Sequence, residues 1–544
     1  MGGKEKMSRK TYILREIKLP LDKSSEAAIS FAKKKLKALN LYPQNADFFI
    51  YRRSVDARKK DAIKLVYAVA INGAWTENEE IKLSQNGFML LSEQKPFVVF
   101  GSEEMKGRPL IVGAGPAGMF AALLLAENGY KPILIERGAP VGERAEQIKR
   151  FSRTRILDEN SNIQFGAGGS GTFSDGKLVT RINDSYSAYV IERFVEFGAP
   201  ESIRFLAKPH IGTDYLQGIV DRILNKIVSL GGSVMYHTCF ESVKKLSDGA
   251  LSVKTSKGEI SCGVLVLAIG HSARDTYENL ISSGFSLEAK PFSVGVRIEH
   301  LRKNIDEAMY GDYASHPALK SAEYSLSANT DKRGVYTFCM CPGGQVVAAA
   351  SENGGVVVNG MSNHARDGIN SNSAVAVSVF REDYGNTPQR AIEFQRKIER
   401  AAFVSGGSNY NAPISTVGDF LNGKAGSEPT SVMPTYMDGR GCTLAKADDF
   451  LPDFICASLR SGLRAFDKKL RGFASESAII TGAETRTSSP VRILRSDMRV
   501  ALGEDLIYPC GEGAGYAGGI TSASLDGIHT AEAIMRRYRP LEKM

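Results

Sequence analysis

The sequence predicts an α/β protein, α+β over its whole length, and three observations lead to this prediction. An apolar run, a glycine-rich turn, a helix-forming stretch and a second apolar run follow one another within residues 108–137. A second glycine-rich segment, followed by a helix-forming stretch, lies at 508–536. Between these segments, residues 290–485 alternate between short strand-like runs and turns. We therefore expect one α/β domain with a β-rich domain inserted into it.

The bulk composition indicates a globular chain of two or three domains. Its 544 residues are 43% hydrophobic and 24% charged, close to the average of globular proteins. No apolar stretch approaches the roughly twenty residues of a membrane span, and the opening MGGKEKMSRK lacks the apolar core of a signal peptide. The seven cysteines include no CxxC pair. We expect a cytoplasmic protein with no membrane partner.

Residues 1–95 predict a small ferredoxin-like domain. Strand-like runs at 11–18, 48–53 and 63–71 accompany a helix that begins near Ser24, in the order β-α-β-β. Most of the net charge of +9 precedes residue 107. These basic residues form either a solvated face or a docking surface for nucleic acid or protein. The domain lacks the aromatic pattern of an RNA-recognition motif.

The turn at 113–118 has the spacing of a dinucleotide-binding turn. Gly113 permits the turn, Gly115 lets the backbone approach a pyrophosphate, and Gly118 lets the helix pack on the strand. The helix begins at Pro116 and Ala117, and the free N–H groups in its first turn then face the phosphates. Glu136, at the end of the second apolar run, can accept hydrogen bonds from a ribose. These features predict a Rossmann-like domain, and the alternative is a purely structural turn.

Further segments predict contacts to the same cofactor. Arg137 and Arg144 carry charges suited to neutralise a pyrophosphate or stack on adenine. The glycine-rich loop 165–178 suits a close approach to a ligand, although a flexible linker is the alternative. The apolar strand that ends at 268–270 returns the chain beneath the nucleotide. Its neighbour His271 is either an acid or base, or a turn histidine bonded to backbone. The predicted contact residues in these segments are Gly168, Gly169, Ser170, Lys177, Ala268 and Gly270.

The segment 508–523 distinguishes between NAD and FAD. A strand-like run leads into Gly511 and Glu512, and the helix after Gly519 begins at Ile520 and Thr521. Glu512 can bind a ribityl hydroxyl, and the helix start can face the flavin edge that becomes negative on reduction. A second nucleotide loop is the alternative. We therefore expect FAD, with its ADP half at 113–118.

The β-rich region supplies the candidate catalytic residues, which are Arg297, His300, Cys339, Cys341 and Arg486. The two arginines could hold an acidic substrate bidentately, or could form inter-strand salt bridges. Residues 336–347 predict a hairpin whose alternation places Cys339 and Cys341 on one face. The CxC pair is then a redox couple or an active-site thiol, or two buried strand cysteines. No His/Cys spacing predicts a metal site.

Five segments carry a resemblance to a known group. They are GAGGSGTFSDGKL, RIEH, FCMCPGG, ETRTSSPVR and YPCGEGAGYAGGITSA. Together with GAGPAG and Glu136, they resemble bacterial FAD-dependent dehydrogenases of the "NAD(FAD)-utilizing" group, within the glutathione-reductase-type FAD fold. The resemblance covers nearly the whole chain. It implies that the C-terminal strand and helix complete the FAD domain. Glu512 stands where such flavoproteins usually have Asp.

These observations predict three domains and one leading function. The domains are a ferredoxin-like domain at 1–95, an FAD domain at 107–285 and 486–544, and an inserted substrate domain at 286–485. The expected activity is hydride transfer between FAD N5 and a small organic substrate. No second GxGxxG unit is present, so NAD(P)H would bind transiently at the flavin face. The alternatives are a flavoprotein that binds or modifies RNA through residues 1–95, and a non-catalytic redox sensor.

Overall fold

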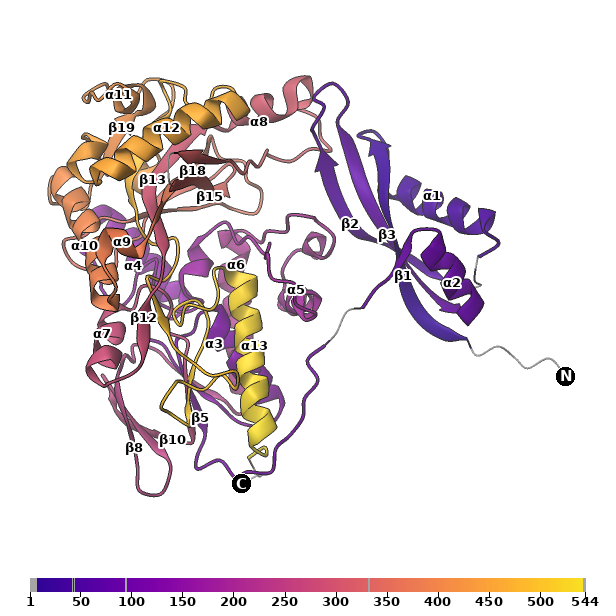
Figure 1. Cartoon of the computed structure of the whole chain (residues 1–544), viewed down its shortest axis with the longest axis horizontal. Helices are drawn as coiled ribbons and strands as arrows, with labels where there is room; N and C mark the ends of the chain where they lie inside the picture. Colours follow the sequence, from indigo (N-terminus) through magenta and orange to yellow (C-terminus); the bar gives the residue numbers. More distant parts are fainter. Residues whose placement is uncertain (1–6, 42, 44, 93–94, 331–332, 542–544) are drawn as a thin grey trace. The chain divides into compact units, whose positions relative to one another are not determined.

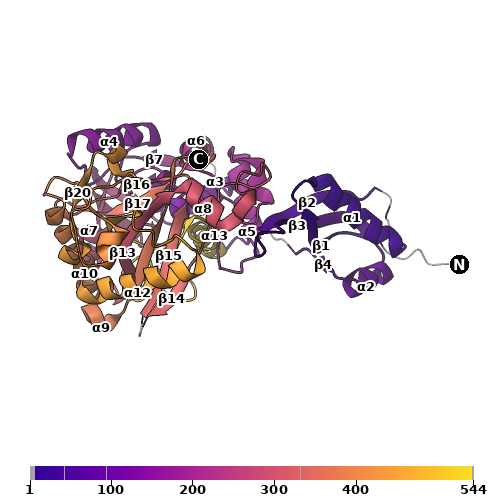
Figure 2. The same ribbon diagram turned by 90° about the horizontal axis from the view of Figure 1, so that it is seen from above.

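A computed structural model describes residues 7–541 except 42, 44, 93–94 and 331–332, and the chain separates into two compact units (Figures 1 and 2). Unit 1 comprises residues 1–95, 183–210 and 306–322, and unit 2 comprises residues 96–182, 211–305 and 323–544. Residues 1–6, which belong to the polar opening that argues against a signal peptide, lie outside the described residues.

Unit 1 contains a four-stranded antiparallel sheet in the order β2-β3-β1-β4. Its elements are β1 (Ser8–Pro20), α1 (Ser25–Ala38), β2 (Asp47–Asp56), β3 (Lys64–Trp75), α2 (Glu77–Gln85) and β4 (Phe88–Leu90). The element order βαββαβ and this strand order are those of a ferredoxin-like domain. Ala28, Ala32 and Leu36 are fully buried, as the periodicity of α1 predicts.

Two segments outside residues 1–95 belong to unit 1. The backbone N–H of Arg53 donates to the carbonyl of Phe205 at 2.6 Å, and its guanidinium donates to the carbonyl of Ala318 at 3.0 Å. The first segment carries α5 (Ser187–Glu196), and the second follows the start of α8 (Arg302–Tyr310). The compact unit therefore extends beyond the domain expected from the sequence, because these pairings join residues far apart in the chain.

Unit 2 is built on a five-stranded parallel sheet in the order β23-β11-β5-β6-β7. The strands are β5 (Pro109–Val112), β6 (Ile133–Ile135), β7 (Ser233–Met235), β11 (Val264–Leu267) and β23 (Ile507–Pro509). The accompanying helices are α3 (Pro116–Glu127), α4 (Val141–Thr154), α6 (Thr213–Ser229), α7 (Arg274–Ser282) and α13 (Ile520–Arg537). This sheet confirms the Rossmann-like fold class.

The C-terminal strand and helix complete this sheet. β23 pairs with β11 through Leu265–Ile507 and Leu267–Pro509, and α13 lies beside α3 (Figure 1). The two helices approach so closely that Gly527 has no room for a Cβ atom against the backbone of Ala117. The antiparallel strands β8 (Phe240–Lys245), β9 (Leu251–Thr255) and β10 (Gly258–Cys262) form a separate three-stranded sheet.

The remainder of unit 2 is β-rich, as predicted. Its seven-stranded sheet has the order β14-β15-β18-β13-β21-β19-β20. The strands are β13 (Phe292–Leu301), β14 (Ser327–Thr330), β15 (Arg333–Cys341), β18 (Asn370–Val379), β19 (Ala412–Thr416), β20 (Cys442–Leu444) and β21 (Ile479–Glu484). The helices are α9 (Arg381–Tyr384), α10 (Pro388–Ser405), α11 (Val417–Leu421) and α12 (Asp453–Lys469). β12 (Leu287–Ala289) and β22 (Val491–Ile493) pair where the chain enters and leaves this region.

The predicted hairpin at 336–347 is wrong. β15 pairs with β14 and β18, whereas β16 (Gln345–Ala348) pairs with β17 (Val358–Met361) in a separate ribbon. The turn at 342–344 therefore passes the chain from one sheet to another. Both strand runs were predicted, but the pairing partners are non-local and do not follow from the strand pattern.

Candidate functional site

One cavity in unit 2 is lined by both glycine-rich segments and by the β-rich region. Most predicted site residues lie in its wall. They are Gly113, Gly115, Pro116, Ala117, Glu136, Arg137, Gly169, Ser170, Lys177, Ala268, Gly270, Cys339, Arg486, Glu512, Gly519 and Ile520. Segments separated by some four hundred residues thus meet around one concave space, which is the usual form of a cofactor site.

The glycine turn has the geometry that a phosphate-binding turn requires. Gly113 has a φ of +100°, and both it and Gly118 pack too closely on backbone atoms to accept a Cβ. Gly115 differs, because a Cβ there would meet no atom nearer than the Cα of Gly169 at 3.9 Å. That Cβ would instead point into the open space at the start of α3. The residues present therefore fit a pyrophosphate at this position.

Glu136 anchors three backbone segments of the site. Its carboxylate accepts hydrogen bonds from the N–H groups of Ala114 at 2.8 Å, Gly138 at 3.0 Å and Gly166 at 2.9 Å. Glu136 is buried and lines the cavity. Since two carboxylate oxygens offer about four acceptor positions, capacity for a ribose remains. The carboxylate also holds the turn and the two following loops together.

The two predicted arginines have different positions. Arg137 lines the cavity, pairs with Asp275 at 2.8 Å and lies over the ring of Phe165. Arg144 is fully buried outside the cavity wall, and its guanidinium donates to the carbonyls of residues 162, 163, 166 and 167. Arg144 therefore binds backbone carbonyls in place of the predicted contact to the cofactor. Five donors in a fixed fork suit such a loop anchor.

The loop that follows also divides into lining and supporting residues. Ser170 and Lys177 line the cavity, and the Lys177 ammonium lies 3.0 Å from the Asp175 carboxylate. Gly168 does not line the cavity, because it packs against Thr172 and Val220. Its positive φ of 82° and this close packing require glycine for structural reasons.

The C-terminal segment places a carboxyl group and a helix start at the cavity. Burial raises the pKa of Glu512 to about 7, although the nearby Lys290 ammonium opposes this shift. Gly511 lies behind the wall, where its N–H donates to Asp526 at 2.7 Å. Thr521 is also outside the wall and donates to the carbonyl of Leu178 at 2.8 Å. Gly511 and Thr521 therefore support the site from behind.

Arg297 forms a buried cluster next to the cavity. Its guanidinium donates to Glu484 at 3.0 Å, to Asn372 at 2.7 Å and to the carbonyl of Cys339 at 2.6 Å. Of these, Glu484 and Cys339 line the cavity, whereas Arg297 does not. Burial raises the pKa of Glu484 to about 7, with Arg297 opposing this shift. Arg297 therefore orients wall residues, and its predicted bidentate hold on a substrate is not available.

His300 does not join the other predicted catalytic residues. It lies three positions after Arg297 on β13 and therefore on the opposite face of the strand. Its Nε2 lies 2.7 Å from the carbonyl of Phe473, and it borders a different cavity, with Asn304 and Arg471. The two candidate catalytic residues Arg297 and His300 therefore do not share a site, because side chains three positions apart on a strand point to opposite faces.

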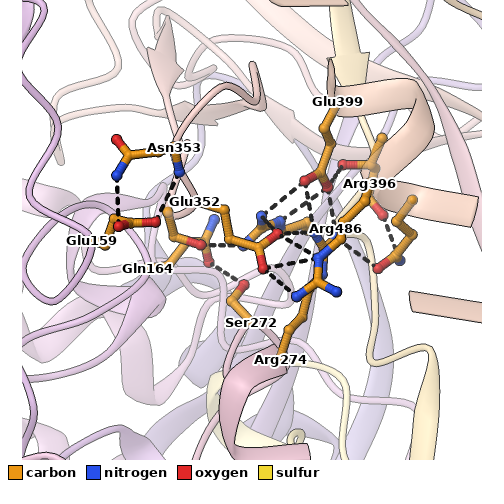
Figure 3. A network of polar contacts seen from close by, with 12 residues as sticks. Glu159, Gln164, Ser272, Arg274, Glu352, Asn353, Arg396, Glu399 and Arg486 are labelled. Atoms are coloured by element: carbon orange, nitrogen blue, oxygen red, sulfur yellow. Dashed lines mark hydrogen bonds and ion pairs between the residues drawn. The ribbon is translucent and has the colours of Figure 1, made fainter. Parts of the chain in front are cut away.

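Arg486 lines the cavity but is held in a network of buried ion pairs (Figure 3). Glu399 on α10 accepts from Arg486 at 3.0 Å and from Arg274 at 2.7 Å. Glu352 accepts from Arg274 at 2.5 Å and from Arg396 at 2.7 Å. The bidentate geometry of Arg486 is thus used by Glu399. The sequence contains no local signal for this pairing, because α10 lies far from Arg486 in the chain.

His271 is uncharged at neutral pH in this environment. Burial lowers its pKa to about 3, and the Arg486 and Arg274 cations add to the effect. Its Nδ1 lies 2.8 Å from Ser272 Oγ, which donates to Gln164 at 3.2 Å. Gln164 and Ser272 also line the cavity and were not predicted. Since neither residue type marks a site by itself, only the fold brings them together.

The CxC pair departs from simple strand alternation. Cys339 has a φ of 45°, and the pairing of β15 with β18 shifts register between Phe338 and Cys341. Phe338 and Cys339 line the cavity, while Cys341 is buried behind it. The predicted sharing of one face is therefore interrupted by a β-bulge, which redirects side chains locally.

The described residues contain neither a cluster of metal-ligating side chains nor a membrane-spanning helix. No group of three or more His, Cys, Asp or Glu side chains in the described part of the chain has the arrangement of a metal site. Among the helices of residues 7–541 that the structure describes, none has the length and apolar character needed to cross a membrane.

Three family models match parts of the chain. Residues 291–487 match "FAD-dependent protein, C-terminal domain-like", and residues 111–181 match "NAD(P)-binding Rossmann-like domain". Residues 13–72 match a domain of unknown function. The first match covers the β-rich region, and the second covers the glycine turn with the loop that follows Glu136.

One relative matches over almost its whole length. An uncharacterized protein of Clostridium beijerinckii is 45% identical over 515 residues, which is 93% of this chain and 96% of that protein. Among solved structures, the flavin-dependent halogenase CmlS has a TM-score of 0.36 at 12% identity, covering 80% of this chain and 59% of that one. CtdE in complex with FAD has a TM-score of 0.33 at 11% identity, covering 79% and 84%.

Proposed function

This chain belongs to a family of FAD-dependent flavoproteins with an NAD(P)-binding Rossmann-like domain, and on that premise we propose that it is an oxidoreductase that transfers hydride between FAD N5 and a small organic substrate. Its cofactor is FAD. Bound FAD supplies two-electron redox chemistry, and the protein supplies binding, orientation and electrostatics. We also propose the narrower placement in the glutathione-reductase-type fold, supported by the completion of the parallel sheet by β23.

The observation that carries this proposal is the continuity of the cavity. At one end, Gly115 and Glu136 suit the ADP half of FAD. At the other, Glu512 and the start of α13 lie in the same wall as Phe338 and Glu484 of the β-rich region. The positive end of α13 favours a ligand edge that gains negative charge on reduction. A substrate would then enter between this edge and the β-rich wall.

The charges at the wall favour an uncharged polar substrate. Three cationic side chains line the cavity, and each has an acidic partner within 3.0 Å. The pairs are Arg137 with Asp275, Lys177 with Asp175, and Arg486 with Glu399. Asp175 and Glu399 are buried, so an acidic substrate that displaced either of them from Lys177 or Arg486 would leave a buried charge unpaired at high cost. We therefore propose a neutral substrate, and NAD(P)H as a transient donor at the flavin face.

An anaerobic screen tests the proposed activity. The holoprotein is mixed with NADH, NADPH and neutral alcohols, amines and enones, and the absorbance of oxidised FAD is followed. We expect one pyridine nucleotide or metabolite to bleach it, and a second compound to restore it. If chemically reduced FAD passes electrons to none of these compounds and no compound reduces it, the proposed activity is refuted.

Matched variants locate the substrate. Phe338 is 37% exposed and lines the cavity, whereas Phe380 is 39% exposed and lies outside its wall. We expect Phe338→Ala to retain FAD and to raise the substrate concentration needed for bleaching at least severalfold. Phe380→Ala should leave both unchanged. Equal effects of the two substitutions would place the substrate elsewhere.

A further inference from the structure

The β-bulge at the end of β15 places one cysteine in the wall of the cofactor cavity and a second directly behind it. Cys339 occupies the left-handed region at φ 45°, which is uncommon for a residue with a side chain. Such conformations cost free energy and are concentrated at functional sites. Cys339 lines the cavity, and the Cys341 thiol donates to the backbone carbonyl of Cys339 at 3.3 Å. In a regular strand, the side chains of Cys339 and Cys341 would lie on the same face, two positions apart.

Cations surround the two thiols. Arg297 Nη2 lies 3.5 Å from Cys341 Sγ and donates to the carbonyl of Cys339 at 2.6 Å. Together with the Cys341 thiol, Arg297 and Lys177 hold the pKa of the Cys339 thiol below its ordinary value. The pKa of Cys341 lies well above its ordinary value, because of its interaction with the Cys339 thiol and its burial. One sulfur is thus favoured as thiolate and the other as thiol.

The remaining cysteines lack this combination. Burial raises the pKa of Cys262, Cys442 and Cys456 to about 12, and it also raises the pKa of Cys239. Cys510 lines the cavity, but burial raises its pKa well above the ordinary value, and its sulfur accepts a hydrogen bond from the Thr530 hydroxyl at 3.4 Å. A low-pKa thiolate next to a resolving thiol is the arrangement found in reactive dithiols.

We propose that Cys339 and Cys341 form a dithiol/disulfide couple that exchanges two electrons with the FAD in this cavity. In the oxidising direction, the Cys339 thiolate and the Cys341 thiol form one Sγ–Sγ bond and break the S–H bond of Cys341. The two electrons released, and that proton, pass to oxidised FAD, so that atoms and charge balance. The proposal rests on the FAD cofactor and not on the substrate of the proposed activity.

Reductive titration of the holoprotein counts these electrons. The protein is oxidised with ferricyanide, desalted and titrated anaerobically with dithionite. We expect the wild-type protein to take up two two-electron equivalents per FAD. Cys339→Ser and Cys341→Ser should each take up one. Cys456→Ser, which removes a buried thiol on α12, should take up two and serves as the matched control.

Alkylation of the wild-type protein gives a second readout that needs no variant. Cleavage after Arg333 and Arg366 releases one peptide that contains both cysteines. After ferricyanide oxidation, this peptide should carry no alkyl group and weigh two hydrogens less. After photoreduction of the FAD, it should carry two alkyl groups.

The proposed dithiol/disulfide couple is refuted if the wild-type protein takes up only one two-electron equivalent per FAD and if both cysteines are alkylated in the oxidised and in the reduced protein. Alkylation of the wild type decides the matter even if a serine variant loses FAD. Substrate-dependent bleaching with these negative results would keep the proposed function and remove the couple. Two two-electron equivalents per FAD and a disulfide in the oxidised protein, with no substrate-dependent bleaching, would support the couple and refute the proposed substrate chemistry.

Discussion

Arg486 presents its guanidinium edge-on to Glu399, with Nε 3.2 Å from Oε1 and Nη2 3.0 Å from Oε2. Both side chains are buried, and Glu399 also binds Arg274 (Figure 3). This one carboxylate therefore joins α10 of the β-rich region to the segment after β21 and to α7. This pairing explains why Arg486, which was expected to bind the substrate, instead links two parts of the fold.

Removing the charge of Glu399 should destabilise the protein strongly. Glu399→Gln leaves two buried guanidinium groups with incomplete partners, and breaking buried pairs costs about 3–5 kcal/mol. Urea denaturation followed by circular dichroism measures this loss. Glu393→Gln removes a partly exposed partner of Arg400 on the same helix and should change the free energy of unfolding by less than about 0.5 kcal/mol. Similar losses in both variants would contradict the central role of Glu399.

Gly115→Val should abolish FAD binding without unfolding the protein. The new side chain would enter the open space in front of the turn, where we place the pyrophosphate. FAD content per chain, measured by absorbance after gel filtration, should fall at least tenfold. Gly142→Ala adds a Cβ where no atom lies within 4 Å and outside the cavity wall, so it should keep full FAD. A stoichiometric FAD content in Gly115→Val would disprove the assignment of the turn.

The FAD-free protein should lose stability as pH rises because of Glu512. Burial raises the pKa of this carboxyl to about 7 in the folded state, from an ordinary value of 4.5. The folded state therefore binds the proton more tightly, and this contribution to the free energy of unfolding is lost between about pH 4.5 and pH 7. Compared with wild type, Glu512→Gln should show a weaker decline over this range. Parallel pH profiles from urea titrations would exclude the effect.

Asp526 should couple α13 to the turn after β23. Its carboxylate accepts from Arg495 at 2.7 Å, from Arg499 at 2.6 Å and from the N–H of Gly511 at 2.7 Å. Asp526→Asn retains the size but leaves the cations without a counter-charge, so we expect a loss of about 3 kcal/mol or more.

FAD should also bind more weakly to Asp526→Asn, because Gly511 supports the position of Glu512. Equilibrium dialysis measures the FAD dissociation constant, and urea denaturation measures stability. Asp505→Asn removes an exposed partner of Lys245 and should leave both quantities unchanged. Normal FAD affinity in Asp526→Asn would show that the turn holds its shape unaided.

The sequence predicts the nucleotide half of the site well, because its determinants are local. Gly113, Gly118 and Glu136 act within one strand–turn–helix–strand unit, and glycine leaves an unambiguous signal where no Cβ fits. The terminal segment was recognised for the same reason. Its glycines and Glu512 lie together in sequence, directly before a helix.

The rest of the site depends on pairings between distant segments. Arg144 serves backbone carbonyls, Arg297 meets Glu484, and Arg486 meets Glu399. A sequence shows that such charges exist but not which partner neutralises them. The bulge at Cys339 likewise arises from register in the sheet. Gln164 and Ser272 were missed because neither residue type distinguishes a site from a surface.

The place of β23 in the parallel sheet has a consequence for synthesis on the ribosome. β11 ends at Leu267 and its neighbour β23 begins at Ile507. At about 5–20 residues per second, the intervening segment takes on the order of tens of seconds to translate. During this time β11 has an unpaired edge, which is prone to aggregation, and α3 lacks the cover of α13. Folding of the nucleotide site, and capture of FAD, must therefore wait for residues 507–537.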